Sequence, residues 1–373
     1  MFTARESFRR SYRTVLKIAV ATLVIAGTLG LILYATSPSP ILLRFEEDWC
    51  LVSIATKSGL IVEAQSKGYE HKIALRARRL ADWRTVWSIK LNGFDIGTGR
   101  KALSSNERYL AITMAITRIP GSPLGHRLVI LDLHHPNPGT VVWEWPEQPI
   151  QGFVRGVEFV DDENLYCCAE ATAQEPGPAI YHLNVARREA KLLLRQRDMP
   201  PGDGNDLRWC GYLKSTGEGL VHAYGKLLAI NLAEPTKQRV LLEPVPKILG
   251  AFFDADVADN GEVIAVAGGS LVLLQEPPDF KKQTVLEPSG GHAVVACSPD
   301  GQYIATTPIT IMGEPWRTFI FSRSEKLTEF SSEPVFGGGI TTGCVHWWPD
   351  GRHLAIEVVG GGWALWRLNL PKK

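Results

Sequence analysis

The segment CSPDGQYIA at residues 297–305 returns as WWPDGRHLA at residues 347–355. Each copy is a Pro-Asp-Gly turn followed by apolar residues of strand type. SSNERYLA at 104–111 and ADNGEVIA at 258–265 keep the same order, and VDDENLYC at 160–167 is a weaker copy. A turn and strand that recur along a chain indicate that it is built from similar structural units.

The spacing of these copies gives the size of the unit. The turn positions are 106, 162, 260, 300 and 350, and the interval between 162 and 260 has room for two units, with GEGLV at 217–221 near its middle. A further degenerate unit fits between Arg44 and Ala102. Each unit continues into a second apolar segment: RLVILDL (127–133), AIYHLNV (179–185), KLLAINL (226–232), SLVLLQE (270–276), RTFIFSR (317–323) and WALWRLNL (363–370). The unit thus has 40 to 56 residues. Repeats of about this length that hold several strands are typical of β-propeller blades.

The copies resemble the PD40 repeat, SPDG-x-[YH]-[IL]-A, of WD40-like and TolB-like propellers, over residues 44–370. The resemblance implies an all-β propeller, with seven blades favoured and six or eight also compatible. A β-sandwich is the alternative fold. The Trp-Asp and Gly-His pairs of true WD40 blades are absent. We expect the turn to join outer and inner strands, Leu110, Ile264, Ile304 and Leu354 to be buried between blades, and the first and last strands to meet in one blade.

The N-terminal region has the composition of a membrane anchor. IAVATLVIAGTLGLILYA at 18–35 carries no charge, and as a helix it would span about 27 Å. We therefore predict a basic cytoplasmic tail at 1–17, a single transmembrane signal-anchor helix at 18–36, a Pro/Ser linker at 37–43 and a propeller at 44–373. A cleaved secretory signal ending at Ala35-Thr36-Ser37, just before Pro38, and a buried core helix are the alternatives.

Charge predicts the orientation of this segment. Five basic residues precede it, and after it Arg44 stands beside three acidic residues. Positive charge stays on the cytoplasmic side, so the propeller is predicted to be extracytoplasmic. The whole chain carries 40 basic and 39 acidic residues, a balance that argues against a nucleic-acid partner. The basic block Arg76, Arg78 and Arg79 is interpreted as a solvated strand edge.

No residue pattern identifies a catalytic, cofactor or metal site. The P-loop, H-E-x-x-H and G-x-S-x-G motifs are absent, and GTGRKA at 97–102 leads into a turn instead of a helix. DADVADNG at 254–261 is the best calcium candidate and GDGND at 202–206 a weaker one, but turn chemistry explains both. His134 and His135 are interpreted as exposed loop residues. The six cysteines show no metal-ligand spacing, and core packing is favoured over a disulfide for them: Cys50, Cys167, Cys168, Cys210, Cys297 and Cys344.

All eleven tryptophans lie after residue 48, several in pairs such as Trp347 with Trp348 and Trp363 with Trp366. We interpret most of them as wedges between blades, with a few placed to anchor a partner. The sequence favours a membrane-anchored propeller that acts as a protein-binding scaffold. The alternatives are a hydrolase or lyase with its site in the central channel, and a structural or sensory ectodomain. All three functional hypotheses rest partly on analogy with other propellers, and a shared fold does not establish a shared function.

Overall fold

The computed structural model describes residues 40–67, 72–93, 95–117, 125–172, 175–202, 207–243, 254–287, 291–308, 317–331, 345–357 and 362–371. The predicted cytoplasmic tail and transmembrane segment, residues 1–36, lie outside this part of the chain, as does Cys344. Among the described residues the one helix is a single 3-10 turn, Gln196–Asp198, and no helix is long and apolar enough to cross a bilayer.

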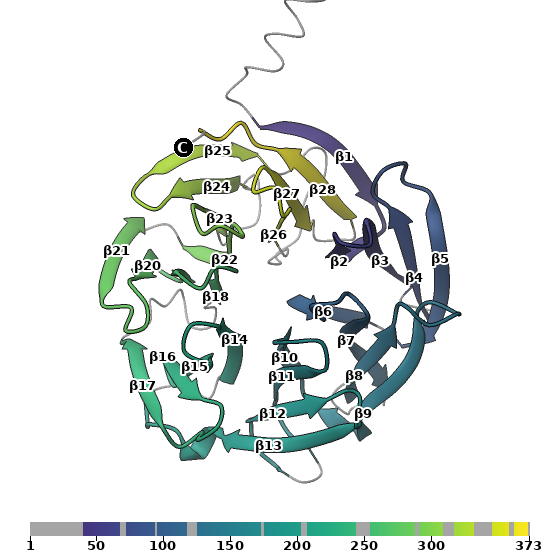
Figure 1. The fold of residues 1–373 in the computed structure, drawn as a ribbon, viewed down its shortest axis with the longest axis horizontal. Coiled ribbons are helices and arrows are strands. Elements are labelled where there is room, and N and C mark those ends of the chain that lie inside the picture. Colours follow the sequence, from purple (N-terminus) through teal and green to yellow (C-terminus); the bar gives the residue numbers. More distant parts are fainter. Residues whose placement is uncertain are drawn as a thin grey trace, which may run out of the picture.

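In the described part of the chain, twenty-eight strands surround a common axis and form an all-β propeller (Figure 1). Each blade has four antiparallel strands, numbered here from the axis outward. Blade 1 contains β2 (Cys50–Ala55), β3 (Leu60–Lys67), β4 (Lys72–Arg79) and β5 (Thr85–Asn92). Blade 2 contains β6 (Asp95–Leu103), β7 (Tyr109–Thr117), β8 (Gly125–Asp132) and β9 (Thr140–Gln151). Blade 3 contains β10 (Val154–Phe159), β11 (Asn164–Ala169), β12 (Ala179–Asn184) and β13 (Glu189–Arg195).

The second half of the chain continues this order. Blade 4 contains β14 (Leu207–Leu213), β15 (Glu218–Ala223), β16 (Lys226–Asn231) and β17 (Gln238–Leu242). Blade 5 contains β18 (Asp254–Val257), β19 (Val263–Ala267), β20 (Leu271–Gln275) and β21 (Lys282–Glu287). Blade 6 contains β22 (His292–Cys297), β23 (Tyr303–Pro308), β24 (Arg317–Ser322) and β25 (Lys326–Ser331). Blade 7 contains β26 (Val345–Trp347), β27 (His353–Glu357), β28 (Gly362–Arg367) and, outermost, β1 (Ile41–Glu47).

Blade 7 joins the two ends of the described chain. β1 pairs antiparallel with β28, with Ile41 opposite Arg367 and Glu47 opposite Gly362. This confirms that the first and last strands share a blade. β1 begins at Ile41, so residues 41–43, expected as the end of the linker, form part of the strand.

The repeated turns connect the first and second strands of a blade. The turn at 298–302 joins β22 to β23 and the turn at 348–352 joins β26 to β27, so the expectation that they join outer to inner strands was wrong. Gly301 and Gly351 adopt φ of +64° and +63°, a conformation that strongly favours glycine. The Asp300 carboxylate accepts hydrogen bonds from the Ser298 hydroxyl and the Gln302 amide, which closes the turn on itself.

Alternation of strand direction gives the ring two different faces. The connections between first and second strands and between third and fourth strands lie on one face, which we call the turn face. The connections between second and third strands and between successive blades lie on the other, which we call the loop face. The longest connections by residue number, 196–206, 243–253 and 332–344, each link the last strand of one blade to the first strand of the next. Loops on a rigid scaffold are where binding residues concentrate.

Apolar side chains fill the space between blades. The described residues contain seven hydrophobic clusters, and each draws its members from two successive blades around the ring. Leu110, Ile264, Ile304 and Leu354, predicted to be buried, are all fully buried. The cluster between blades 7 and 1 is the smallest, with five buried members. This seam therefore depends more than the others on polar contacts.

Candidate functional site

Lys101 links innermost strands of blades that are not neighbours, near the turn-face end of β6. It projects from β6 of blade 2, and its Nζ donates a hydrogen bond of 2.8 Å to the Val257 carbonyl of blade 5. The same nitrogen lies 3.7 Å from Glu158 Oε1 and 4.0 Å from Asp256 Oδ1. One side chain thus connects blades 2, 3 and 5. Glu158 is also the residue through which β10 pairs in parallel with β6, which joins blades 2 and 3 into one eight-stranded sheet.

The charges of this group fix its protonation. Burial disfavours the ammonium form of Lys101, but Glu158, Asp256 and Asp259 outweigh burial and raise the pKa of the amine. Burial raises the pKa of Glu158, opposed by Lys101 and by a 2.7 Å hydrogen bond from the Trp209 indole. Lys101 is therefore a cation, unsuited to act as a nucleophile, because nucleophilic lysines need a lowered pKa.

The acidic segment 254–261 serves to join blades 5 and 6. Asp254 Oδ2 accepts a hydrogen bond of 3.0 Å from the Val295 amide, and Asp256 Oδ2 accepts one of 2.8 Å from the Cys297 amide. On its other side Asp254 lies 3.7 Å from Arg208 of β14. Within the described residues no group of His, Cys, Asp and Glu is arranged to hold a metal ion. These carboxylates are occupied by backbone amides and cations of neighbouring blades.

A second buried charge network lies at the seam between blades 7 and 1. Glu63 of β3 is fully buried and accepts hydrogen bonds from Arg76 and from the Trp363 indole, the latter at 2.9 Å. Arg76 and Arg78 of β4 also pair with Glu46 of the N-terminal strand β1. Burial raises the pKa of Glu63, whereas hydrogen bonds from Arg78 and Arg44 outweigh burial and lower the pKa of Glu46.

This network corrects the interpretation of the basic block as a solvated strand edge. Arg78 is 7% exposed, and its side chain and that of Arg76 lie inside the seam. Only Arg79 is exposed as expected. No local pattern distinguishes Arg76 and Arg78 from Arg79, because the acidic partner Glu46 comes from the outer strand of another blade.

A cavity of about 230 Å³ opens between blades 3 and 4 on the loop face. Its apolar walls are Phe153, Cys168, Ala169, Pro178 and Leu207, and its polar lining is the ion pair of Arg155 with Glu170. The residues belong to β10, β11 and β14 and to the connections beside them. No sequence motif pointed to this cavity, because its lining comes from three separate strands.

Phe153 stands at this cavity with 48% of its surface exposed. Its ring lies 4.6 Å from the ring of the buried His126 and 5.3 Å from the Arg155 guanidinium. Among the described residues, the other exposed large apolar side chains all lie on outermost strands, and Phe153 is the aromatic one of the set: Leu42, Leu43, Val86, Val141, Phe153, Val240 and Val285. Phe153 is therefore an apolar surface residue that belongs to neither of the hydrophobic clusters of blade 3.

Cysteines and histidines take structural positions in the described part of the chain. Cys167 and Cys168 of β11 are buried, and burial raises the pKa of each thiol. The five described cysteines are present as thiols, without a disulfide. His134 is exposed in the β8–β9 connection, and His135 is half-buried there, where its Nδ1 accepts a hydrogen bond from the Asn137 amide. Residues 203–206 of the weaker calcium candidate lie outside the described residues.

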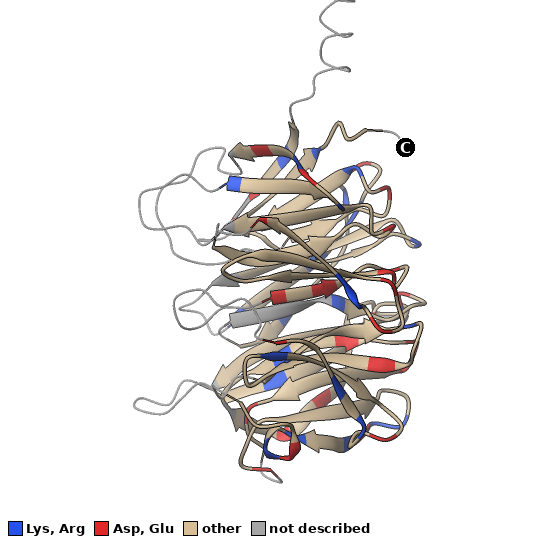
Figure 2. Ribbon diagram, turned by 90° about the vertical axis from the view of Figure 1, so that its left-hand side faces the viewer, with Lys and Arg blue, Asp and Glu red and all other residues tan. Residues whose placement is uncertain are grey.

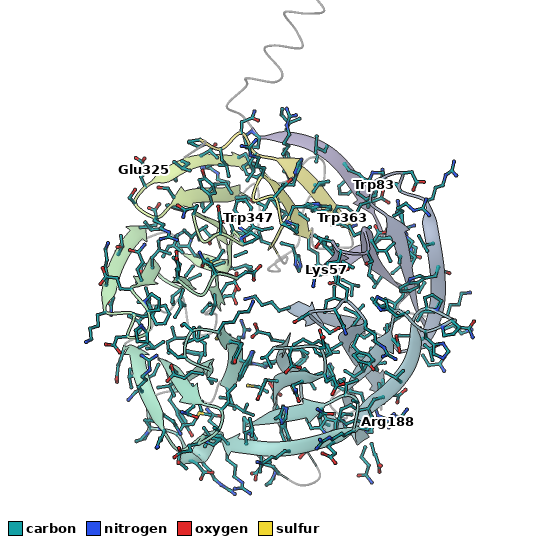
Figure 3. The ribbon with its side chains drawn as sticks, in the orientation of Figure 1. Lys57, Trp83, Arg188, Glu325, Trp347 and Trp363 are labelled. Atoms are coloured by element: carbon teal, nitrogen blue, oxygen red, sulfur yellow. The ribbon has the colours of Figure 1, made fainter. Side chains whose placement is uncertain are left out.

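Tryptophans mostly fill the space between blades, as predicted. Trp363 is fully buried, and the Trp347 indole donates a 2.9 Å hydrogen bond to the Ala296 carbonyl of blade 6. Figure 3 shows both in the blade 7 region, whereas Arg188 and Glu325 lie on the outer rim. Figure 2 shows acidic and basic residues interspersed over the ring seen edge-on.

Comparison with known proteins supports the fold and leaves the family open. No family model matches the chain, and no curated protein matches it in sequence. Among solved structures, the β-propeller domain of Cps50 (Swd1) from Myceliophteria thermophila aligns with a TM-score of 0.60 at 13% identity. The alignment covers 89% of this chain and 100% of that one. As many as 837 solved chains are similar, so the shape alone selects no activity.

Proposed function

We propose that this protein is a membrane-anchored, extracytoplasmic scaffold that binds another protein through the loop face of its propeller. The observation that carries the proposal is that the charged groups on the innermost strands already have partners within the protein. Lys101 contacts Glu158 and Asp256, and backbone amides of blade 6 donate hydrogen bonds to Asp254 and Asp256. The loop face in turn carries the cavity and the exposed Phe153.

The alternative, an enzyme, would use the same charged residues around Lys101. Glu158, buried with a raised pKa beside a cation, has the properties of a general acid. Its Oε2 already accepts the Trp209 indole N–H and its Oε1 faces Lys101, so both oxygens have partners. A catalytic acid must also reach a substrate, and these contacts favour the scaffold over the hydrolase or lyase.

The membrane address rests on the uncharged segment 18–35 and the basic residues before it. The chain enters β1 at Ile41, opposite Arg367 on the turn-face edge of blade 7. The four residues 37–40 between the predicted helix and β1 reach at most about 14 Å. An anchor ending at residue 36 would thus hold that edge close to the bilayer, with the loop face on the opposite side of the ring.

Two measurements on the full chain test this proposal. A reporter fused after Lys373 should be active only outside the cytoplasm, and deletion of residues 18–35 should release the protein from membranes. A reporter active in the cytoplasm would contradict the address.

The binding face is tested with a photo-crosslinking residue at Pro176 on the loop face and, as the matched control, at Arg352 on the turn face. Both positions are exposed. We expect protein adducts at position 176 and few or none at 352. Equal adduct yields at the two positions would contradict loop-face binding.

A further inference from the structure

The first strand of the propeller begins with two exposed leucines. Leu42 is 37% exposed and Leu43 is 44% exposed, at the start of β1 on the outer rim of blade 7 (Figure 1). The other exposed large apolar residues of the described chain stand singly, on different strands or connections. Among the described residues, β1 is therefore the one place where two such side chains follow each other.

A β-bulge accounts for this pair. Leu42 pairs with Trp366 and Arg44 pairs with Leu365, so the intervening Leu43 has no partner on β28. A regular strand sends successive side chains to opposite faces, whereas a bulge redirects the extra residue. The strand thus keeps both leucines at the surface, although leucine is among the residues most often buried.

The charged residues that follow are directed to the seam between blades 7 and 1. Arg44 forms an ion pair with Glu46, and its guanidinium lies 4.1 Å from the centre of the Trp83 ring of blade 1. Glu46 also pairs with Arg78. An apolar contact at the two leucines therefore does not require either charge of β1 to lose its partner.

Chain connectivity indicates what these leucines meet. They come six and seven residues after residue 36, the predicted end of the apolar helix. Residues 37–40 reach at most about 14 Å, so the start of β1 cannot move far from the membrane surface once the helix is inserted. A bilayer is an apolar phase that the chain itself brings to the leucines, and exposed leucines gain free energy by entering its interfacial region.

Basic residues at the same end of blade 7 fit a lipid surface. Arg367 is the residue of β28 opposite the first residue of β1. Arg352 is exposed, and its carbonyl accepts a 2.7 Å hydrogen bond from the Leu368 amide, which places it beside the end of β28. The Asp350 carboxylate of the same turn is paired with His353. Arginines at this position attract the phosphates of lipid headgroups.

From these observations we infer that Leu42 and Leu43 insert into the membrane leaflet that faces the propeller, and so fix the tilt of the ring with its loop face directed away from the bilayer. This inference rests on the proposed function, because it requires the anchor at 18–36. It adds a contact between lipid and the propeller itself.

The direct test places a photo-crosslinking residue at position 43 of the full chain in nanodiscs of phosphatidylcholine and phosphatidylglycerol. The matched control is position 285, because Val285 is 58% exposed on the outermost strand of blade 5. We expect adducts with lipid acyl chains at position 43, located by mass spectrometry, and none above background at position 285. Equal yields at the two positions, or adducts with protein in place of lipid at position 43, would overturn the inference.

A second measurement follows the position of the whole ring. Energy transfer from the tryptophans to dansyl-labelled lipid in the same nanodiscs should fall in the double variant Leu42→Ser/Leu43→Ser and stay unchanged in Val285→Ser. Circular dichroism confirms that both variants are folded. Unchanged transfer in a folded double variant would show that the leucines do not hold the ring against the bilayer.

Co-purification with the nanodisc separates this inference from the proposed function. A chain that co-purifies but gives no acyl adduct at position 43 overturns the leucine contact and leaves the anchor intact. A chain that does not co-purify overturns the anchor, and the leucine contact with it. Loop-face binding is decided separately by the adducts at position 176.

Discussion

Lys101 illustrates how a propeller can be stiffened by one residue. Its side chain reaches from blade 2 to the Val257 carbonyl of blade 5, past carboxylates of blades 3 and 5. Blades 2 and 5 are not neighbours, so stacking of adjacent sheets cannot supply this link. The cation also offsets carboxylates that would otherwise repel one another in a confined space.

We expect Lys101→Met to lower the free energy of unfolding by about 2–3 kcal/mol, because it strands Glu158 and Asp256 without their cation. The loss is set below the ~3–5 kcal/mol of a fully buried pair because the Lys101 side chain is 27% exposed. Urea unfolding followed by tryptophan fluorescence measures it. Lys57→Met is the matched control, because it removes only an exposed hydrogen bond from Lys57 Nζ to the Ser105 carbonyl on the turn face. It should lower the free energy of unfolding by less than about 1 kcal/mol. Equal losses would contradict a special role for Lys101.

His292 at the start of β22 is fully buried against the edges of the Phe319 and Phe321 rings. Its Nδ1 lies 3.2 Å from the Thr306 hydroxyl, and its Nε2 has no hydrogen-bond partner among the described residues. Burial lowers the pKa of this imidazole to about 4 from its ordinary value near 6.5. The folded protein therefore holds His292 neutral where the unfolded chain would protonate it.

The unfolded state binds the extra proton, so stability should fall as the pH is lowered from about 6.5 to about 4, by up to roughly 1.4 kcal/mol per pH unit. Above pH 6.5 the effect is absent. His292→Leu should flatten this part of the curve of unfolding free energy against pH. The exposed His134→Leu should leave the curve as in wild type. A wild-type slope retained in His292→Leu would show that other groups produce it.

The strand-turn-strand element at the turn face is where local sequence and structure agree best. Gly301 and Gly351 occupy the same position of the repeated turn with nearly the same φ. Their surroundings differ. A Cβ on Gly301 would lie 3.1 Å from the Ala258 Cβ and 3.2 Å from Asn260 Oδ1 of blade 5, whereas nothing lies within 4 Å of one on Gly351. One turn packs against its neighbour and the other is open.

Gly351→Ala should lower the free energy of unfolding by about 1–2 kcal/mol, from backbone strain alone. Gly301→Ala should lower it by more, because the added Cβ would also crowd Ala258 and Asn260 of blade 5. Thermal unfolding of the two variants, monitored by circular dichroism, compares them directly. If Gly351→Ala is the more damaging, the packing of these turns differs from that described above.

At the scale of the molecule, closure of the ring is the decisive event. The seam between blades 7 and 1 has the smallest apolar cluster, and it is reinforced by the Glu63 network and by the pairing of β1 with β28. Trp363 and Glu63, which share a 2.9 Å hydrogen bond, are 300 positions apart in the chain. Contacts of such long range form only when the whole ring is assembled.

A pair of truncations tests this view of the seam. Deletion of residues 1–39 keeps β1 and should leave a folded, monomeric propeller. Deletion of residues 1–47 removes β1 and Glu46, which exposes the edge of β28 and leaves Arg76 and Arg78 short of a carboxylate. We expect the second protein to aggregate or to lose its cooperative thermal transition, measured by size-exclusion chromatography and calorimetry. Equal behaviour of the two proteins would mean that β1 does not close the ring.

The sequence by itself determined the repeating unit, the class of fold, and the pairing of the first strand with the last. Turns and strands are local: Asp-Gly chemistry and the apolar residues that follow act within about ten residues, and the regular spacing of the copies makes stacked blades the way to bury them. The burial of Leu110, Ile264, Ile304 and Leu354 followed from position in the repeat.

Only the tertiary structure decided which polar residues meet. Lys101 finds Val257 and Asp256, Arg78 finds Glu46, and Phe153 comes to lie beside Leu207 at one cavity. Each of these groups combines residues from different blades, and their juxtaposition depends on blade number, stagger and the closed ring. The sequence shows which side chains are charged or apolar and so able to make such contacts. Which of them come within contact distance depends on the assembled ring.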